Sequence, residues 1–450
     1  MANLPHLRPR NTKLPPTLDA FRHRGFRLLW PANFFSYISR WMQMTLMVWL
    51  VLELTGSPFL VALVGFFGMI PLLLFGAIGG VLADRADRRK LIMLTQLLNL
   101  AASAAMLFLL VTGSEEYWHS YIVVLASGLG WAFDMPARRS IVLDVTGRAG
   151  VTNAMALDSV GMHASRMIGP ALAGILIQVV GLIGGYVVII ALYLVALVFL
   201  TALKLPPREI VQATHSVARN LLEGFLYVRS NRIILATVVV TVLMNLLLFP
   251  YMQMVPVIAR ETLNVGAGLM GLLMGADGLG AIIGSIAIAS FGQLRYHGRV
   301  YLGGSLIGLV LVLAFAASQW FAVSLPVLIL LGLGTAGFGT MQSTIIVISA
   351  SDDMRGRALG VISLAIGAGP IGALLIGAVA ETTSPATGIT IFAILGIISL
   401  SLVALLMPEL RAPMRQQPPE SGNSTQAQVS PDESRAVPAD SRAERGSKPV

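Results

Sequence analysis

Long apolar stretches separated by short polar ones occupy this chain from Phe26 to Met407. Six of them precede a polar segment at about 204–231, and six more follow it. An α-helix rises 1.5 Å per residue, so about 20 apolar residues cross the hydrocarbon core of a bilayer. The pattern therefore predicts an all-α membrane protein with twelve spanning helices. The predicted spans are residues 26–54, 58–82, 91–112, 120–136, 154–180, 183–203, 232–256, 267–291, 299–317, 322–347, 357–380 and 386–407.

The polar segments divide the chain into five parts. The central one separates two halves of six helices each, and a polar tail lies at either end. The C-terminal tail is rich in Pro, Ser, Gln and Arg and is expected to be disordered. The predicted parts are an N-terminal tail (1–25), a first half (26–203), a linker (204–231), a second half (232–407) and a C-terminal tail (408–450).

The linker carries one regular pattern. Val217, Leu221, Phe225 and Val228 recur at helical spacing, which predicts an amphipathic helix lying along the membrane surface. A tether that only needs to be amphipathic is the simpler interpretation of the same pattern.

Composition supports a membrane protein and excludes several other classes. Of 450 residues 56% are hydrophobic and only 12% are charged, whereas about a quarter are charged in a soluble domain. The absence of cysteine excludes disulfides and cysteine metal sites. The chain has neither a G-x-x-x-x-G-K-[ST] phosphate loop nor H-E-x-x-H spacing, which argues against ATP hydrolysis and a catalytic zinc site. We therefore expect no enzyme activity and no cofactor, and either an ion gradient or the substrate's own gradient as the energy source.

The distribution of cations predicts the orientation. Of the 31 lysines and arginines, all except Arg40, Arg166 and Arg260 fall in or beside the two tails and alternate loops. Positive loops stay in the cytoplasm, so both termini are expected there. The net charge of +9 indicates topology, not nucleic-acid binding. The N-terminal tail has no apolar core, so no cleavable signal peptide is expected.

The loop after the second span has a distinctive composition. Glycines near the end of that span allow a close helix contact, and Asp84 at the helix end can bind the positive N-terminus of another helix. The cations hold the loop in the cytoplasm, and for those after Asp87 this interpretation is sufficient. The residues are Gly76, Gly79, Gly80, Asp84, Arg85, Arg88, Arg89 and Lys90.

The two halves repeat short motifs. Gly169-Pro170 in the fifth span has a counterpart in Gly369-Pro370 in the eleventh. Each pair follows a loop with a Gly/Arg turn, which in the second half contains Arg355 and Arg357. Internal duplication is typical of transporters that work by alternating access and is unusual in a receptor or scaffold.

The loop residues Gly80, Asp84, Arg85, Arg88 and Arg89 resemble the signature of the major facilitator superfamily of secondary transporters. Other stretches are similar to its drug and siderophore exporters of the transmembrane secretion effector type, which include enterobactin-exporter-like proteins. The resemblance runs from about Phe26 to Met407. It implies two six-helix halves that rock about a central cavity, proton antiport, and docking of Asp84 at the N-terminus of the eleventh helix. It also implies that Gly169 and Pro170 give the close, kinked packing between the halves.

Charges at membrane depth are candidate functional groups, because each costs at least about 2.5 kcal/mol without a partner or a wet cavity. Arg40 lies in the first span, near Ser36, Gln43 and Thr45 on helical spacing. Arg40 either has a purely structural role, paired with such groups, or takes part in the binding or transfer of substrate or protons. The resemblance favours the second role, because the first helix of that fold lines the cavity.

Arg166 and Asp277 lie in the fifth and eighth spans. In the resembling fold these helices face one another, so we hypothesise an ion pair that breaks and reforms at the moving interface. Asp277 is the candidate proton carrier, since burial raises a carboxyl pKa and Arg166 lowers it. His163 is close to Arg166 on the same helix face and is either a proton relay or a hydrogen-bonded structural residue.

Several polar residues complete the prediction. Asp134 and Arg138, in a segment that resembles the Pro-Ala-Arg motif of the family, are expected to form salt bridges at the inner gate. Arg355 and Arg357 belong to the equivalent cluster after the tenth span. Cargo contacts, or plain interhelical hydrogen bonds, are expected from Asn245, Gln253 and Gln342.

Together with the resemblance, the sequence predicts a monomeric, multi-pass plasma-membrane transporter, a proton-coupled exporter that works by alternating access. Its expected partners are lipid, protons and a small-molecule cargo. Two arginines against one aspartate at depth favour anionic or amphiphilic cargo such as a drug or siderophore. An importer of the same fold, a lipid flippase, and a non-transporting sensor or scaffold are the alternatives.

Overall fold

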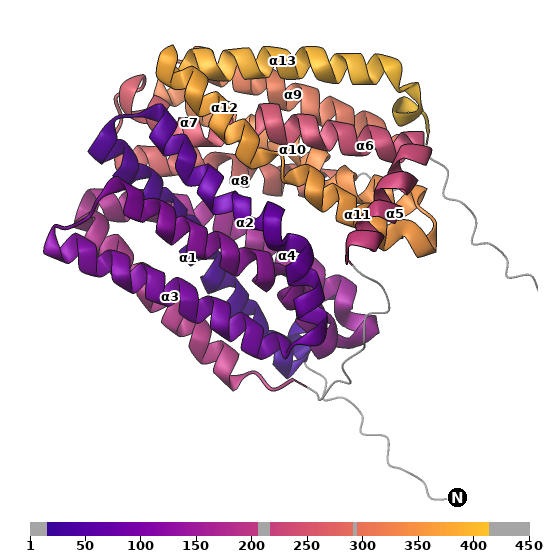
Figure 1. The fold of residues 1–450 in the computed structure, drawn as a ribbon, viewed down its shortest axis with the longest axis horizontal. Helices are drawn as coiled ribbons and strands as arrows, with labels where there is room; N and C mark the ends of the chain where they lie inside the picture. Colours follow the sequence, from indigo (N-terminus) through magenta and orange to yellow (C-terminus); the bar gives the residue numbers. More distant parts are fainter. Residues whose placement is uncertain (1–15, 206–216, 291–294, 414–450) are drawn as a thin grey trace, which may run out of the picture. The chain divides into compact units, whose positions relative to one another are not determined.

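The computed structural model describes residues 16–205, 217–290 and 295–413, and every regular element in these ranges is helical (Figure 1). Most of the helices begin and end within three residues of the predicted spans. In chain order the elements are η1 (Pro16–Arg22), α1 (Arg24–Thr55), α2 (Pro58–Arg85), α3 (Arg88–Thr112), α4 (Tyr117–Ala202), α5 (Val217–Ser230), α6 (Arg232–Leu243), the π-helical turn η2 (Met244–Leu248), α7 (Tyr251–Glu261), α8 (Ala267–Ser290), α9 (His297–Ala317), α10 (Phe321–Ser349), α11 (Asp352–Ile366), α12 (Gly369–Thr382), α13 (Pro385–Leu406) and η3 (Pro408–Arg411).

The long element α4 contains two sharp breaks. Gly147 has φ 67° and ψ 177°, and Gly181 has φ 71° and ψ −176°, a backbone conformation that glycine adopts readily and other residues rarely do. The breaks divide α4 into three helical stretches. The predicted end of the fourth span at residue 136 is wrong, because the helix continues past Pro136 to the break at Gly147. The charged residues that follow Pro136 suggested a loop, but Arg138 lies within the helix and its charge is paired inside the bundle.

Within the described ranges, nine helices are long and apolar enough to cross a membrane. One of them, Gly150–Ala202, is 53 residues long and includes the break at Gly181. About 20 residues suffice for one crossing, so the chain is a multi-pass membrane protein of helical type.

Buried side chains form separate cores before and after the linker. Two cores are built from α1 to α4, and the largest is built almost wholly from residues after Arg232. The exceptions are Ala62 at the start of α2, which packs in the largest core, and Val257 near the end of α7, which packs with the earlier helices. The two sets of helices therefore interlock near these residues.

Helices α4 and α8 approach each other closely along a glycine seam. A Cβ at Gly174 would lie 2.3 Å from the carbonyl oxygen of Ala267, and one at Gly271 would lie 2.3 Å from that of Pro170. Only glycine leaves room for such backbone contact, as is common where membrane helices pack. Gly169 has a different neighbour, because its Cβ would meet Trp41 on α1 at 2.6 Å.

The linker and the start of the C-terminal tail pack on the second set of helices. Val228 of α5 is buried in a small core with residues of α6, α10 and α11. Residues 408–411, which were expected to belong to a disordered tail, form η3, where Leu410 is fully buried. A hydrogen bond from Arg232 lowers the pKa of Glu409 and ties η3 to α6. Residues 16–22 of the N-terminal tail form η1, whereas residues 1–15 and 414–450 of the two tails lie outside the described ranges.

The glycine seam generates a stability prediction. We expect Gly271→Ala to lower the thermal unfolding midpoint in detergent by several degrees, because overpacking a tight contact costs about 1–3 kcal/mol and Pro170's carbonyl cannot swing aside. Gly303→Ala in α9 is the matched control, since a Cβ there meets nothing within 4 Å. Equal midpoints for the two variants would contradict the close contact.

Candidate functional site

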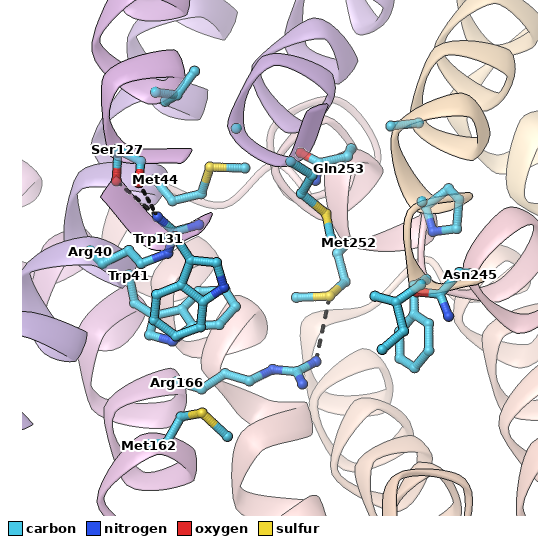
Figure 2. Close-up of a pocket in the computed structure, with 18 of the residues that line it drawn as sticks. Arg40, Trp41, Met44, Ser127, Trp131, Met162, Arg166, Asn245, Met252 and Gln253 are labelled. Atoms are coloured by element: carbon cyan, nitrogen blue, oxygen red, sulfur yellow. Dashed lines mark hydrogen bonds between the residues drawn. The ribbon is translucent and has the colours of Figure 1, made fainter. Parts of the chain in front are cut away.

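A cavity of about 390 Å3 lies inside the helix bundle (Figure 2). Its walls come from α1, α2 and α4 on one side of the linker and from η2, α7, α10, α11 and α12 on the other. This volume lies within the range of sites that hold a drug-sized molecule. The cavity is thus enclosed by helices from both parts of the chain.

Eight of the 22 residues that line the cavity carry aromatic or thioether side chains. Methionine is flexible and polarisable, so it adapts to ligands of different shape, and large aromatic rings supply flat contact area. The residues of this type are Trp41, Met44, Met69, Trp131, Met162, Phe249, Met252 and Phe338. The sequence analysis did not single out any of them, because an aromatic or methionine within a span has the same local pattern whether it faces lipid, core or cavity.

Arg40 lies on this wall and is held by α4. Its Nη1 donates to the carbonyl oxygen of Ser127 at 2.8 Å and to the Ser127 hydroxyl at 3.0 Å. The guanidinium stacks over the ring of Trp131, 4.6 Å from its centroid (Figure 2). Ser36, which was considered as a neighbour, instead donates to Gln96, and Thr45 bonds its own helix.

Arg166 and Asp277 form the hypothesised ion pair between α4 and α8. The Tyr251 hydroxyl also donates to Asp277, at 3.3 Å, and the guanidinium lies 5.7 Å from the ring centroid of Trp41. Arg166 lines the cavity, whereas Asp277 is buried behind it. Whether the pair breaks during a cycle stays a prediction.

The other predicted pathway residues also lie on the cavity wall: His163, Asn245, Gln253 and Gln342. Asn245 donates to the carbonyl oxygen of Thr241, and Gln342 donates to the hydroxyl of Thr241, both at 2.9 Å. The second bond joins α10 to α6. Interhelical bonding is therefore part of the role of Gln342, whereas Asn245 bonds back along its own helical segment. The place of all four residues on the wall keeps them within reach of a ligand.

Asp134 and Arg138 form a buried pair, 2.5 Å apart, in a polar network inside the first set of helices. Arg138 also donates to Asn33 and Ser36 on α1, and Thr95 on α3 donates to Asp134. All of these described partners lie on α1, α3 and α4, so the pair ties the first set of helices together. It does not span the two sets in this structure, unlike a gate contact.

The loop between α2 and α3 is anchored by its arginines. Arg88 pairs with Asp144 of α4 at 2.7 Å, and Arg89 Nε donates to the carbonyl oxygen of Leu200 near the end of α4. Both contacts position the loop, and the second places a cation at a helix C-terminus, where the dipole favours it. Arg85 is exposed.

Of the glycines expected to allow a close helix contact next to this loop, Gly79 makes one and Gly76 does not. A Cβ at Gly79 would lie 2.2 Å from the carbonyl oxygen of Ala132 on α4, whereas one at Gly76 would meet only its own helix, at Leu72. The surroundings of Gly80 and the side chain of Asp84 lie outside the described part of the structure, so the docking of Asp84 stays a prediction.

The predicted cluster on α11 contacts the linker helix. Arg357 pairs with Glu223 of α5 at 3.2 Å, and Arg355 is half-buried on the same helix. Further along, a Cβ at Gly369 would lie 3.6 Å from the thioether methyl of Met69 on α2, and Pro370 is buried in the first turn of α12.

Two charged contacts that the sequence analysis missed close one end of the bundle. We call it the Gly56 end, because α1 ends there and α2 begins. Glu381 of α12 accepts hydrogen bonds from the Ser57 hydroxyl at 2.8 Å and the Phe59 amide at 3.1 Å, at the N-terminus of α2. Arg260 of α7 donates to the carbonyl oxygen of Leu52, near the C-terminus of α1, at 2.7 Å.

Both charges complement a helix dipole, and both join the first set of helices to the second. Beside them, a Cβ at Gly377 of α12 would lie 2.4 Å from that of Ala62 on α2. The cavity is therefore sealed from the Gly56 end by these contacts between a charge and a helix terminus and by tight packing. No local pattern indicated these partners, because they are more than 200 residues apart in the chain.

Comparison with known proteins agrees with this architecture. The multidrug efflux pump Tap of Mycolicibacterium fortuitum is 28% identical over 388 residues, which cover 81% of this chain and 90% of that protein. The staphyloferrin A transporter of Staphylococcus aureus is 23% identical, and the alignment covers 78% of this chain and 88% of that protein. Macrolide efflux protein A of Streptococcus pyogenes is 22% identical, and the alignment covers 62% of this chain and 68% of that protein.

Solved structures show the same fold at low identity. A bacterial homologue of the human lysosomal transporter Spinster, inward-facing and unoccupied, aligns with a TM-score of 0.66, covering 89% of this chain and 99% of that one at 14% identity. A POT family transporter in complex with 5-aminolevulinic acid aligns with a TM-score of 0.69 at 12% identity, covering 86% and 97%. Residues 16–434 match the transmembrane secretion effector family as a whole, and the chain belongs to this family of major facilitator transporters.

Proposed function

We propose that this protein is a proton-coupled exporter of small amphiphilic or anionic molecules that works by alternating access. The observation that carries the proposal is the cavity, which is enclosed by helices from both parts of the chain and sealed at the Gly56 end. A binding site between two bodies, closed on one side, is what a rocking transporter requires. The cell membrane, with both termini in the cytoplasm, is its proposed location.

Twelve crossings follow if each break in α4 is a turn between two crossings, and if the interruptions after α6 and after α11 are kinks within one crossing. Gly147 and Gly181 divide α4 into three crossings, while η2 joins α6 to α7 and Gly367 joins α11 to α12. With both termini inside, the Gly56 end faces outward. The structure then corresponds to a state closed to the outside.

Export, not import, is proposed from the relatives, because two of the three named above are efflux proteins. The fold itself does not decide direction, since peptide and nucleoside transporters share it. Import therefore remains the alternative function. The adaptable methionine and aromatic wall supports cargo that is amphiphilic and of variable shape.

Proton coupling is proposed to act at the Arg166–Asp277 pair. The pair joins α4 and α8, which would separate or slide when the halves rock, and a buried acid that loses its cation favours the protonated form. Binding of one proton by Asp277 would release Arg166. We propose a monomer as the working unit, because one chain encloses the cavity.

The direct test of function is transport in everted membrane vesicles. We expect vesicles that contain the protein to accumulate a fluorescent amphiphile when respiration acidifies their interior, and an uncoupler to abolish the accumulation. Vesicles that contain the destabilised Gly271→Ala variant should accumulate less of the amphiphile, which would show that accumulation depends on the folded protein. Accumulation that an uncoupler leaves unchanged would contradict proton coupling, and uptake into intact cells would favour the importer.

Asp277→Asn tests the proposed carrier. It removes the titratable group and leaves a similar shape, so we expect proton-driven accumulation to fall at least tenfold while the cargo still binds, since Asp277 does not line the cavity. Glu409→Gln is a matched control, because it also removes an arginine-bound carboxylate but lies in η3, at the end of the bundle. Undiminished proton-driven transport by Asp277→Asn would eliminate the carrier role.

A further inference from the structure

We propose that Arg40, Ser127 and Trp131 form a subsite for the anionic group of a planar aromatic cargo, whereas Arg166 serves the ion pair with Asp277. This inference rests on the proposed transport function and divides two roles that the cavity's two arginines would otherwise share. It concerns binding, so it is testable without transport.

The first argument is the unfilled hydrogen-bonding capacity of Arg40. A guanidinium has five N–H donors in a planar fork, and here only Nη1 donates to described residues, both times to Ser127. No carboxylate among the described residues lies within salt-bridge distance of it. Asp134 is close enough to attract Arg40 at longer range, but it is paired with Arg138. A cation at membrane depth without an ion pair of its own calls for an anion from the cavity it lines.

The second argument is the contrast with Arg166. Its Nη2 is committed to Asp277, which also accepts from Tyr251. Neutralisation of this charge leaves Arg166 a poor attractor for an anion while the pair is intact. Thus the cavity's net positive charge is concentrated at Arg40.

The third argument is the orientation of the rings around Arg40. Trp131 stacks against the guanidinium and is itself held edge-on by Tyr37, with ring centroids 5.8 Å apart. Trp41, the residue after Arg40 in α1, also lines the cavity. An acid on a flat ring would place its charge at the Arg40 fork and its ring against indole, where stacked or edge contacts are favourable.

The lining residues also disfavour the opposite charge. Among the described residues that line the cavity there is no Asp or Glu, so an aromatic cation would meet the charge of Arg40 and no carboxylate on the wall. Specificity then comes from repulsion as well as attraction. The cargo class is an aromatic carboxylate, sulfonate or phenolate with an apolar body.

A charge series on one ring tests the subsite. Binding of 2-naphthoate, 2-naphthamide and 2-naphthylmethylammonium to the purified protein in nanodiscs is measured by calorimetry. We expect the anion to bind at least tenfold more tightly than the amide, and the cation most weakly. Arg40→Gln should abolish the preference for the anion over the amide, Arg40→Lys should keep part of it, and Trp131→Leu should weaken all three probes.

Arg299→Gln is the matched control, since Arg299 also stacks on an aromatic ring, that of Tyr296 at 4.1 Å, but lies outside the cavity wall. It should leave all three affinities unchanged. The subsite is refuted if the cation binds as tightly as the anion, if none of the probes binds, or if Arg40→Gln keeps the preference. Since no gradient is used, failure here is distinct from the failure of proton-driven transport in vesicles.

Discussion

A charge inside an apolar helix bundle needs a partner, and this requirement organises the described structure. The cost of an unpaired ion in a low-dielectric medium is several kcal/mol, so each buried arginine fixes the position of whatever neutralises it. Arg138 is paired within the first set of helices, and Arg166 is paired across to the second. The first pair ties the first set of helices together, whereas the second joins the two sets.

The same electrostatics act at the helix ends. Glu381 and Arg260 each satisfy a helix terminus of the opposite partial charge on the other set of helices. Such contacts are specific but individually modest, so they are compatible with the proposed alternating access, in which this seal opens. The glycine seam between α4 and α8 adds close van der Waals contact without interlocking side chains, so one helix can shift along the other. Closure at the Gly56 end is thus built from reversible interactions.

The sequence was sufficient for the helices and for part of the cavity. Apolar length predicted the elements, and the Arg166–Asp277 contact followed because two charges at depth lay on helices that face one another in the resembling fold. The end of the fourth span was wrong because Arg138 looked like a loop cation, whereas its partners Asp134 and Asn33 come from the fold. Trp131 and Glu381 were missed for the same reason: their roles depend on partners that no local pattern reveals.

The most direct measurement of the central claim is the distance across the Gly56 end. The chain has no cysteine, so spin labels on Leu54→Cys and Thr383→Cys, both exposed, need no altered background. In nanodiscs the account predicts a short and a long distance population, with Glu381→Gln enriching the long one because it weakens the seal. A single distance, unchanged by Glu381→Gln and by a transported cargo, would contradict alternating access in this protein.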